Sequence, residues 1–250
     1  MKLLIKPARF IDADGRRVKV SDFEKHLVDE NKDFHTKYGI VASSSMKKGG
    51  VVSVGKESFN VLDTSFIDLY KNMKRDAQIM MLKDLGAILA LTGITKDSVV
   101  AEAGCGSGAA TCFFAEHAKQ VFSFDIENKN LDVAKDNVKY LGLKNVTFKE
   151  LDVYATSPKL EADLFILDVP DPSKAVKNAL SAVKAGGFLV VYAPHIHQLQ
   201  NVVVELPETV LKEGILQVEH KQWLVDEKRS RPETRDVAHT GFLLIARKLA

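Results

Sequence analysis

The chain has 250 residues, of which 46% are apolar and 27% are charged, and its formal net charge is +2. These values are typical of a soluble globular chain and exclude intrinsic disorder, collagen and coiled coil. The longest apolar runs, such as residues 188–193, are far shorter than the roughly 18 to 20 residues of a membrane span. The start of the chain has no apolar region typical of a secretory signal, so we expect a cytoplasmic protein.

Positive charge is concentrated at the front of the chain. Residues 1–76 carry fifteen Lys and Arg against eleven Asp and Glu, whereas residues 77–250 carry twenty against twenty-two. Such a surplus favours an anionic partner such as nucleic acid, although many neutral binders show the same.

The first sixty or so residues predict short β-strands separated by turns. The strands are expected at Leu3–Lys6, Val18–Val20, Gly39–Ala42, Val51–Val54 and Ser58–Leu62. The last two flank residues 55–57 and form the clearest hairpin. Residues 1–64 are thus predicted to form a small β module. From Phe66 to Met73 apolar residues recur at spacings of three and four, which predicts a connecting helix over residues 65–76.

Residues 77–250 predict a second domain in which helices alternate with short apolar strands. The strands are expected at Val99–Ala103, Val121–Asp125, Val146–Leu151, Leu164–Val169, Phe188–Ala193, Val218–Val225 and Phe242–Lys248. The helices are expected at Leu82–Leu91, Ala109–Ala118, Asn128–Leu141, Lys174–Val183 and Gln198–Glu213. This order predicts an α/β fold with a doubly wound, mostly parallel sheet. The last two strands follow each other without a helix, which predicts a reversed hairpin at one edge.

A glycine-rich turn follows the first strand of this domain. Residues 102–108 read Glu-Ala-Gly-Cys-Gly-Ser-Gly and lead into a helix. Glycines allow a close approach of the backbone to a ligand, and the helix start offers free N–H donors. The GxGxG spacing is neither the dinucleotide fingerprint nor a P-loop. The turn alone is weak evidence, because a tight strand-to-helix connection uses the same residues.

Two further strand ends carry carboxylates. Asp125 ends the next strand, where a carboxylate can accept hydrogen bonds from both hydroxyls of a ribose. Asp152 follows the third strand, where it could accept a hydrogen bond from the exocyclic amine of adenine. Because ligands bind at the carboxyl ends of parallel strands, we expect a ligand that contains a nucleoside.

The domain resembles the class I S-adenosylmethionine-dependent methyltransferases, with residues 102–108 as their first motif. Residues 73–80 and 83–89 resemble the preceding segment of the tRNA adenine-N1 methyltransferases, which modify the T-loop adenine at position 58 or its neighbour at 57. Three later segments match this family in the same order: residues 167–172, 188–194 and 239–248. The front module matches loosely, and Ser173 stands where the family usually has tryptophan.

The resemblance implies an enzyme that moves a methyl group from S-adenosylmethionine to N1 of a T-loop adenine in tRNA. Asp168 is then the catalytic residue, because a carboxylate facing the exocyclic amine orients the base and relieves the charge created at N1. The implied cofactor-binding residues are Gln78, Glu102, Gly104, Gly106, Ser107, Gly108, Asp125, Asp152 and Val153. The candidates for substrate contact are Arg231, in a charged loop predicted to overhang the pocket, and His239.

Simpler interpretations stand beside these roles. Asp168 could cap the turn that follows its strand, Gln78 could be a surface residue, and the charged loop at residues 226–235 could only be solvated. No metal is expected, because His195 and His197 have no further ligand at a suitable spacing. Cys105 and Cys112 are expected to be reduced thiols.

Other functions remain as alternatives. The nearest is a class I methyltransferase that acts on a small molecule such as a corrinoid precursor. A non-catalytic RNA-binding subunit, as in the family's eukaryotic complexes, is opposed by the intact glycine motif, Asp125 and Asp168. A charge of +2 is small for a protein that grips tRNA, so we expect a homo-oligomer, which in the resembled family is a tetramer.

Overall fold

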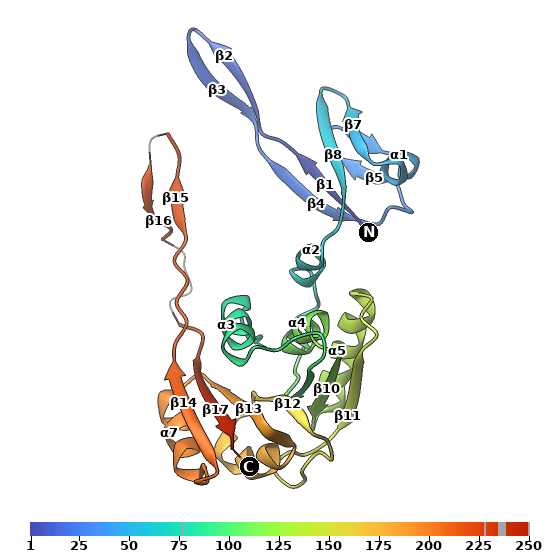
Figure 1. The fold of residues 1–250 in the computed structure, drawn as a ribbon. Helices are drawn as coiled ribbons and strands as arrows, with labels where there is room; N and C mark the ends of the chain where they lie inside the picture. Colours follow the sequence, from blue (N-terminus) through green and yellow to red (C-terminus); the bar gives the residue numbers. More distant parts are fainter. Residues whose placement is uncertain (77, 228, 235–238, 250) are drawn as a thin grey trace. The chain divides into compact units, whose positions relative to one another are not determined.

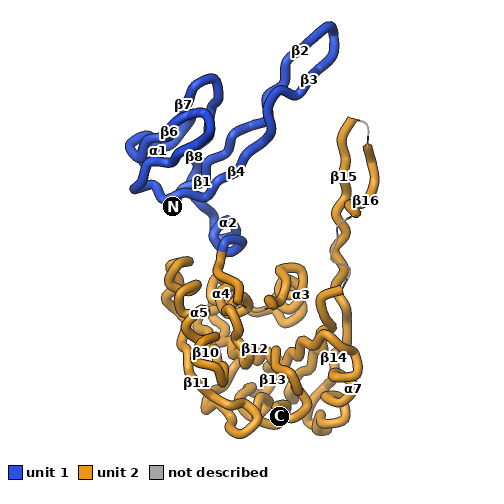
Figure 2. The backbone as a smooth tube through the Cα atoms, turned by 180° about the vertical axis from the view of Figure 1, so that it is seen from behind, with its two compact units in different colours: residues 1–72 blue, residues 73–250 orange. Residues whose placement is uncertain are grey.

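The computed structural model describes residues 1–76, 78–227, 229–234 and 239–249. They divide into two compact units, Met1–Asn72 and Met73–Ala250 (Figure 2). The boundary between the units lies inside the segment that the sequence predicts to connect them.

Unit 1 is built on a four-stranded antiparallel sheet with the order β4-β1-β8-β7. These strands are β1 (Lys2–Lys6), β4 (Glu24–Val28), β7 (Gly50–Val54) and β8 (Glu57–Asp63). The remaining elements are β2 (Arg9–Ala13), β3 (Arg16–Ser21), β5 (Phe34–Thr36), β6 (Gly39–Val41), α1 (Ser43–Lys48) and α2 (Phe66–Tyr70). Val54 pairs with Glu57, which confirms the predicted hairpin.

The sequence missed four elements of unit 1, β2, β4, β5 and α1, and overextended α2. Strand β4 carries three charged or polar side chains in succession, and helix α1 buries only Met46, so neither shows a clear apolar period. The predicted connecting helix ends at Tyr70 as α2. The following segment is held by a tertiary contact instead, because the backbone N–H of Lys74 donates to Oδ1 of Asn137 at 2.9 Å.

Unit 2 contains a seven-stranded sheet with the order β11-β10-β9-β12-β13-β17-β14. Its strands are β9 (Val99–Ala103), β10 (Gln120–Asp125), β11 (Val146–Glu150), β12 (Ala162–Leu167), β13 (Val183–Ala193), β14 (Val210–Leu216) and β17 (Phe242–Lys248). Strand β17 is antiparallel to both of its neighbours, and the other pairs are parallel. The predicted fold class, a mostly parallel doubly wound sheet with a small N-terminal β module, is confirmed.

Helices cover both faces of this sheet (Figure 1). One face carries α3 (Leu82–Thr92), α4 (Ala109–His117) and α5 (Asn128–Tyr140), and the other carries η1 (Pro172–Ala175), α6 (Val176–Ser181) and α7 (Ile196–Glu205). The buried strands read as almost continuous apolar runs, as expected for a sheet that is covered on both sides.

The helix predicted at residues 198–213 and the strand predicted at residues 218–225 are both shorter than expected. Helix α7 ends at Glu205, because Pro207 cannot continue it and Leu206 is already extended. Residues 210–216 then form β14, the edge strand of the sheet, where the sequence predicted the end of a helix. The predicted late strand shrinks to β15 (Trp223–Val225), which pairs with β16 (Ser230–Pro232) in a separate two-stranded sheet.

A buried lysine links three strands of unit 1. Lys6 has no exposed surface, and its Nζ donates to Ser21 Oγ at 3.1 Å and to the Asp22 carbonyl at 2.5 Å. The carboxylates of Glu24 and Glu57 lie 3.8 and 3.9 Å from the same atom. Lys6 therefore neutralises negative charge that the module buries between β1, β4 and β8.

We expect Lys6→Ala to lower the free energy of unfolding of unit 1 by about 3 kcal/mol, because it leaves buried charge uncompensated. Urea unfolding followed by circular dichroism measures the change. Lys32→Ala, at an exposed position of the same module, is the control and should change stability by less than about 0.5 kcal/mol. Equal stability of the two variants would contradict the role assigned to Lys6.

Candidate active site

The glycine turn after β9 is packed against the end of β12. Gly104 has a φ of +86°, and a Cβ atom placed there would lie 1.9 Å from the backbone oxygen of Asp168. Its N–H donates to the carbonyl of Phe124 at 3.0 Å, and Asp168 N–H donates to the carbonyl of Ala103 at 3.0 Å. Only glycine fits here, so the turn and the fourth strand end can meet at one edge of the sheet.

The carboxylate of Asp125 organises the neighbouring strand end. It accepts hydrogen bonds from the backbone N–H groups of Gly106 at 3.1 Å and Glu127 at 2.9 Å. The side-chain amide of Asn130 donates to both oxygens, at 3.2 and 3.3 Å. Asp125 is 7% exposed, so these bonds fix its orientation toward the space beside the glycine turn.

A cavity of about 380 Å³ opens at this edge, within the range typical of sites for small molecules and cofactors. Seven of the residues predicted from the sequence line it: Gln78, Gly104, Gly106, Asp125, Asp152, Val153 and Asp168. The other described lining residues are Ala103, Ile126, Glu127, Asn130, Leu151, Tyr154, Val169 and Pro170. The structure therefore brings together side chains from four strand ends and from the segment before α3.

Three predicted cofactor residues lie behind the cavity wall rather than among its described lining residues. Glu102 is 3% exposed and accepts hydrogen bonds from the hydroxyls of Thr111 and Ser123. Ser107 Oγ accepts from the N–H of Asp76 at 3.1 Å. A Cβ atom at Gly108 would lie 2.8 Å from Ala134 Cβ, so this glycine lets α4 pack against α5. These contacts join the glycine turn and its flanking elements to α4, α5, β10 and the segment before α3.

Two carboxyl groups of the site, those of Asp168 and Glu102, have raised pKa values. Burial raises the pKa of Asp168 to about 7. Burial also raises the pKa of Glu102 to about 8, and the negative charges of Asp168 and Asp125 add to the shift while Thr111 opposes it. The site thus gathers three acids in a poorly solvated place, which favours a positively charged ligand.

The segment before β17 meets the same edge of the sheet. His239 Nε2 lies 2.9 Å from the carbonyl oxygen of Pro194, just after β13, and the ring packs on Phe242. Tyr192 donates its hydroxyl proton to the Thr240 carbonyl at 2.6 Å, and burial raises its pKa to about 12, with a contribution from the charge of Asp168. His239 is exposed, so it can face a substrate at this edge.

A buried ion pair fixes this segment to α3. Lys83 Nζ donates to Asp84 at 2.7 Å, to Thr240 Oγ1 at 2.6 Å and to the carbonyl of Val218 at 2.6 Å. Asp84 has no exposed surface and accepts a second bond from Thr240 at 2.9 Å. No local sequence pattern indicates this network, because its members lie far apart in the chain.

Arg231 lies in β16, is exposed, and is not among the described residues that line the cavity. In the same charged segment Asp226 pairs with Arg229 at 2.5 Å. Lys228 and Arg235 lie outside the described residues. The prediction that this loop overhangs the pocket stays a prediction.

Sequence reasoning missed Asn130 and Tyr154. Asn130 lies in the first turn of α5, five residues after Asp125, and that short spacing after a strand-end acid is the signal that could have found it. The Tyr154 hydroxyl accepts the N–H of Asp171 at 3.1 Å, so it ties two loops of the site together. Ser173, the departure from the family pattern, donates to Asp171 at 2.9 Å and stabilises the turn.

The residues that the structure describes were searched for metal sites, membrane-spanning helices and disulfides. They include no group of three or more His, Cys, Asp or Glu residues that could bind a metal ion. None of the helices that they form is long and apolar enough to cross a membrane. Cys105 and Cys112 are free and buried, and burial raises the pKa of Cys112 to about 12.

The seven-stranded sheet with one reversed strand, the glycine turn after β9 and the acid that ends β10 define a class I methyltransferase fold. The profile of the family described as "tRNA methyltransferase complex GCD14 subunit" matches residues 68–229. A tRNA (adenine(57)-N(1)/adenine(58)-N(1))-methyltransferase TrmI of Methanocaldococcus jannaschii is 30% identical over 90% of this chain and 91% of its own. The chain belongs to this GCD14/TrmI family, which confirms the resemblance inferred from the sequence.

Further relatives agree with this family. A tRNA (adenine(58)-N(1))-methyltransferase TrmI of Thermus thermophilus is 30% identical, over 86% of this chain and 88% of its own. Among solved structures, an O-methyltransferase of Thermotoga maritima has a TM-score of 0.81 at 25% identity and covers 100% of this chain and 92% of its own. TrmI of Aquifex aeolicus shares the fold, with a TM-score of 0.76 at 21% identity over 100% of this chain and 97% of its own.

The buried Glu102 should make stability depend on pH. The unfolded carboxyl loses its proton near its ordinary pKa of 4.5, whereas the folded one keeps it until about 8, so stability falls as pH rises through this window. We expect Glu102→Gln to be more stable than wild type by a margin that grows by up to about 1.4 kcal/mol per pH unit. Urea unfolding at several pH values measures this margin; a margin that does not change with pH would show that Glu102 is already ionised.

Proposed function

We propose that this chain is an S-adenosylmethionine-dependent tRNA methyltransferase that modifies N1 of adenine in the T loop, at position 58. The placement of Asp168 carries the proposal: it lines the same cavity as Gly104 and Asp125, at the strand edge where class I methyltransferases work. The names of the M. jannaschii and T. thermophilus relatives supply the substrate. The name of the M. jannaschii relative also includes position 57, so we propose the adenine at position 57 as a second target.

The residues of the cavity fit the methyl donor. Asp125 is held with its carboxylate toward the cavity and would accept the ribose hydroxyls, and Asp152 with Val153 would contact the adenine. Gly104 and Gly106 bring backbone close to the donor, and Gln78 lies where it would reach the methionine portion. Glu102, Ser107 and Gly108 hold the turn that makes this contact. When bound, the donor supplies an electrophilic methyl group on a sulfonium cation.

Asp168 would act on the acceptor base. The lone pair of N1 forms the new bond to the methyl carbon while the electrons of the carbon–sulfur bond stay on sulfur. Methylation leaves the adenine positively charged, and an ionised Asp168 would accept a hydrogen bond from the exocyclic amine and stabilise that charge. The T-loop adenine is paired in folded tRNA, so it must turn out of its stack to reach this edge. His239 stands where it could contact the displaced nucleotide, and Arg231 could contact phosphates.

The alternatives are less well supported. A solved precorrin 8W decarboxylase covers 72% of this chain with a TM-score of 0.59 at 17% identity, so the likeness to a corrinoid enzyme is one of fold. A non-catalytic RNA-binding subunit would not need the complete set of glycines and acids that line the cavity here.

The wider setting is part of the same proposal. Residues 1–64 would serve as an RNA-contacting module, residues 65–76 as a connector and residues 77–250 as the catalytic domain. A homotetramer would supply the basic surface that one chain of net charge +2 lacks, by letting one subunit hold the tRNA while another modifies it. Such an enzyme would work in the cytoplasm.

Incubation with labelled S-adenosylmethionine and unmodified tRNA transcript tests the proposal directly. We expect N1-methyladenosine in the T loop, identified by mass and position after digestion. Donor binding without transfer to tRNA would keep the methyltransferase class and redirect the search to small-molecule acceptors.

We expect Asp168→Ala to cut turnover by about two orders of magnitude or more, while the affinity for the donor stays close to wild type. Asp168→Asn, which keeps the shape but not the charge, should lose a similar amount. Single-turnover methylation and calorimetric titration of the donor separate the two effects. Equal losses of donor binding and turnover would make Asp168 a structural residue.

The rate should also follow the ionisation of Asp168. With limiting tRNA, kcat/KM should rise with pH and level off above a midpoint at or below about 7, because the sulfonium of the bound donor lowers the pKa of the carboxyl. The slope below the midpoint should be close to one on a logarithmic plot, corresponding to a single proton. A rate that falls over the same range would mean that the protonated acid is the active form.

A further inference from the structure

The hairpin β2–β3 of unit 1 exposes both of its faces. Every residue of β2 is exposed, as is every residue of β3 except Ser21. Its large apolar side chains, Phe10, Ile11, Val18 and Val20, are 41 to 50% exposed. A two-stranded hairpin is at best marginally stable in water on its own, so this exposed surface is suited to contact with a partner.

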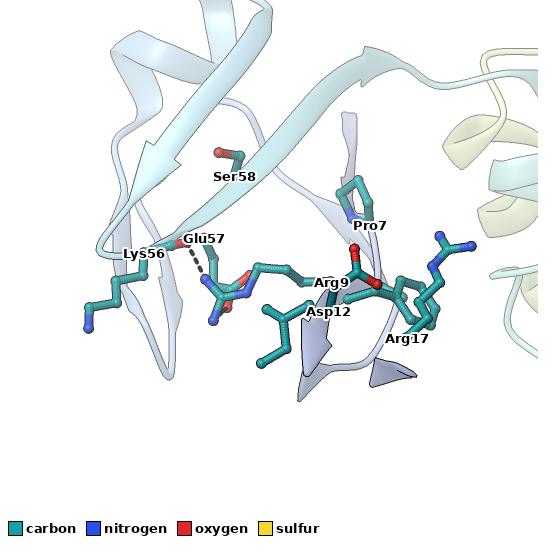
Figure 3. Close-up of a pocket in the computed structure, with 10 residues that line it drawn as sticks. Pro7, Arg9, Asp12, Arg17, Lys56, Glu57 and Ser58 are labelled. Carbon is teal, nitrogen blue, oxygen red and sulfur yellow. Dashed lines mark hydrogen bonds and ion pairs between the residues drawn. The ribbon is translucent and has the colours of Figure 1, made fainter. Parts of the chain in front are cut away.

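A groove of about 470 Å³ lies where the hairpin leaves the sheet of unit 1 (Figure 3). The β2–β3 hairpin provides one wall and the β7–β8 turn the other. Arg9, Arg17 and Lys56 bring positive charge to it, and Asp12 and Glu57 bring negative charge. The groove is separate from the cavity of unit 2, because all of its lining residues belong to unit 1.

The register of the hairpin places aromatic and charged groups on one face. Asp12 pairs with Arg17 and Phe10 pairs with Lys19, and residues two apart in a strand share a face. The guanidinium of Arg17 lies over the ring of Phe10, 4.4 Å from its centroid. Arg17 and Phe10 therefore form a cation–π pair, and both side chains are exposed.

The opposite wall of the groove is held in place by Arg9. Its Nη1 donates to the carbonyl of Lys56 at 3.3 Å, and its other terminal nitrogen lies 3.8 Å from Glu57 (Figure 3). These contacts tie the base of the hairpin to the β7–β8 turn. The side chain of Lys56 is left pointing away from this contact (Figure 3).

We propose that this groove binds an unpaired nucleotide segment of the RNA substrate. Arg17 and Lys56 would contact phosphates, and a base would stack on the Phe10–Arg17 pair. Asp12 would accept a hydrogen bond from an exocyclic amine of the base. This inference rests on the proposed function, which makes RNA the substrate. It adds a second RNA site, in a different unit from the cavity that would bind the donor.

The mixture of groups favours a nucleotide over other anionic partners. A planar base matches a guanidinium–aromatic pair, and such stacking is the usual way in which proteins hold unpaired RNA. Asp12 and Glu57 would repel an acidic peptide, whereas they can accept hydrogen bonds from the amines of a base. The hairpin itself carries four Lys and Arg against two Asp over residues 9–21, which suits a polyanion.

The test measures binding of a fluorescein-labelled, unstructured RNA of about ten nucleotides to the full chain by anisotropy. We expect Phe10→Ala to raise the Kd roughly 5- to 100-fold, the usual effect of losing one stacked base. The double change Arg17→Ala and Lys56→Ala should lower the slope of log K against log salt by about 1.4, or about 0.7 for each phosphate that is no longer neutralised. Circular dichroism checks that each variant is folded.

Arg16→Ala is the matched control. Arg16 pairs with Ala13, so it lies on the opposite face of the same hairpin, and its loss removes one positive charge, as the loss of Arg17 does. We expect its RNA affinity to stay close to wild type. Affinities of Phe10→Ala and the double variant that equal the control would overturn the proposal.

Methylation of tRNA by the wild type is measured alongside and separates the two proposals. Methylation with no effect of Phe10 on RNA binding would leave the function intact and reject the groove. Phe10-dependent RNA binding without methylation would support the groove and count against the function.

Sedimentation measures whether Phe10→Ala changes the oligomeric state. A change in oligomeric state with RNA affinity unchanged would overturn the RNA groove and make the hairpin an interface between copies of this chain.

Discussion

The close approach of two strand ends is the constraint on which the site depends. Gly104 and Asp168 follow adjacent strands, β9 and β12, and no side chain larger than hydrogen fits between their backbones. The approach places the backbone of the glycine turn beside the carboxyl group proposed to act on the acceptor base. A donor held by the turn and a base held by Asp168 would then meet without a large movement of either strand.

Negative charge in a poorly solvated place is the second feature of the site. Glu102 lies behind the glycine turn, and its raised pKa reflects burial together with the charges of Asp168 and Asp125. A cation in the cavity would relieve this repulsion. Repulsion among these carboxylates is unfavourable at high pH. The same negative charge attracts the sulfonium of the donor and, after transfer, the cationic product.

Contacts between distant segments complete the site from both sides. Asn137 in α5 accepts from the N–H of Lys74 and donates to its carbonyl, which orders the chain before Gln78. On the other side, Lys83 and Asp84 hold Thr240 and so set the path of His239. Neither contact takes part in chemistry, yet both fix segments whose own sequences do not specify a regular structure.

The sequence by itself determined the alternation of strands and helices in unit 2, the glycine turn and the strand-end acids Asp125 and Asp152, because these depend on local patterns and on the shared edge of a parallel sheet. Tertiary structure alone decided that β14 forms at residues 210–216, since Pro207 ends the helix and β17 offers an unpaired edge. It also decided that Glu102 is buried rather than facing the cavity, and that Asn130 and Tyr154 join the site. Burial and long-range pairing depend on which elements meet in space, and a local sequence pattern does not contain that information.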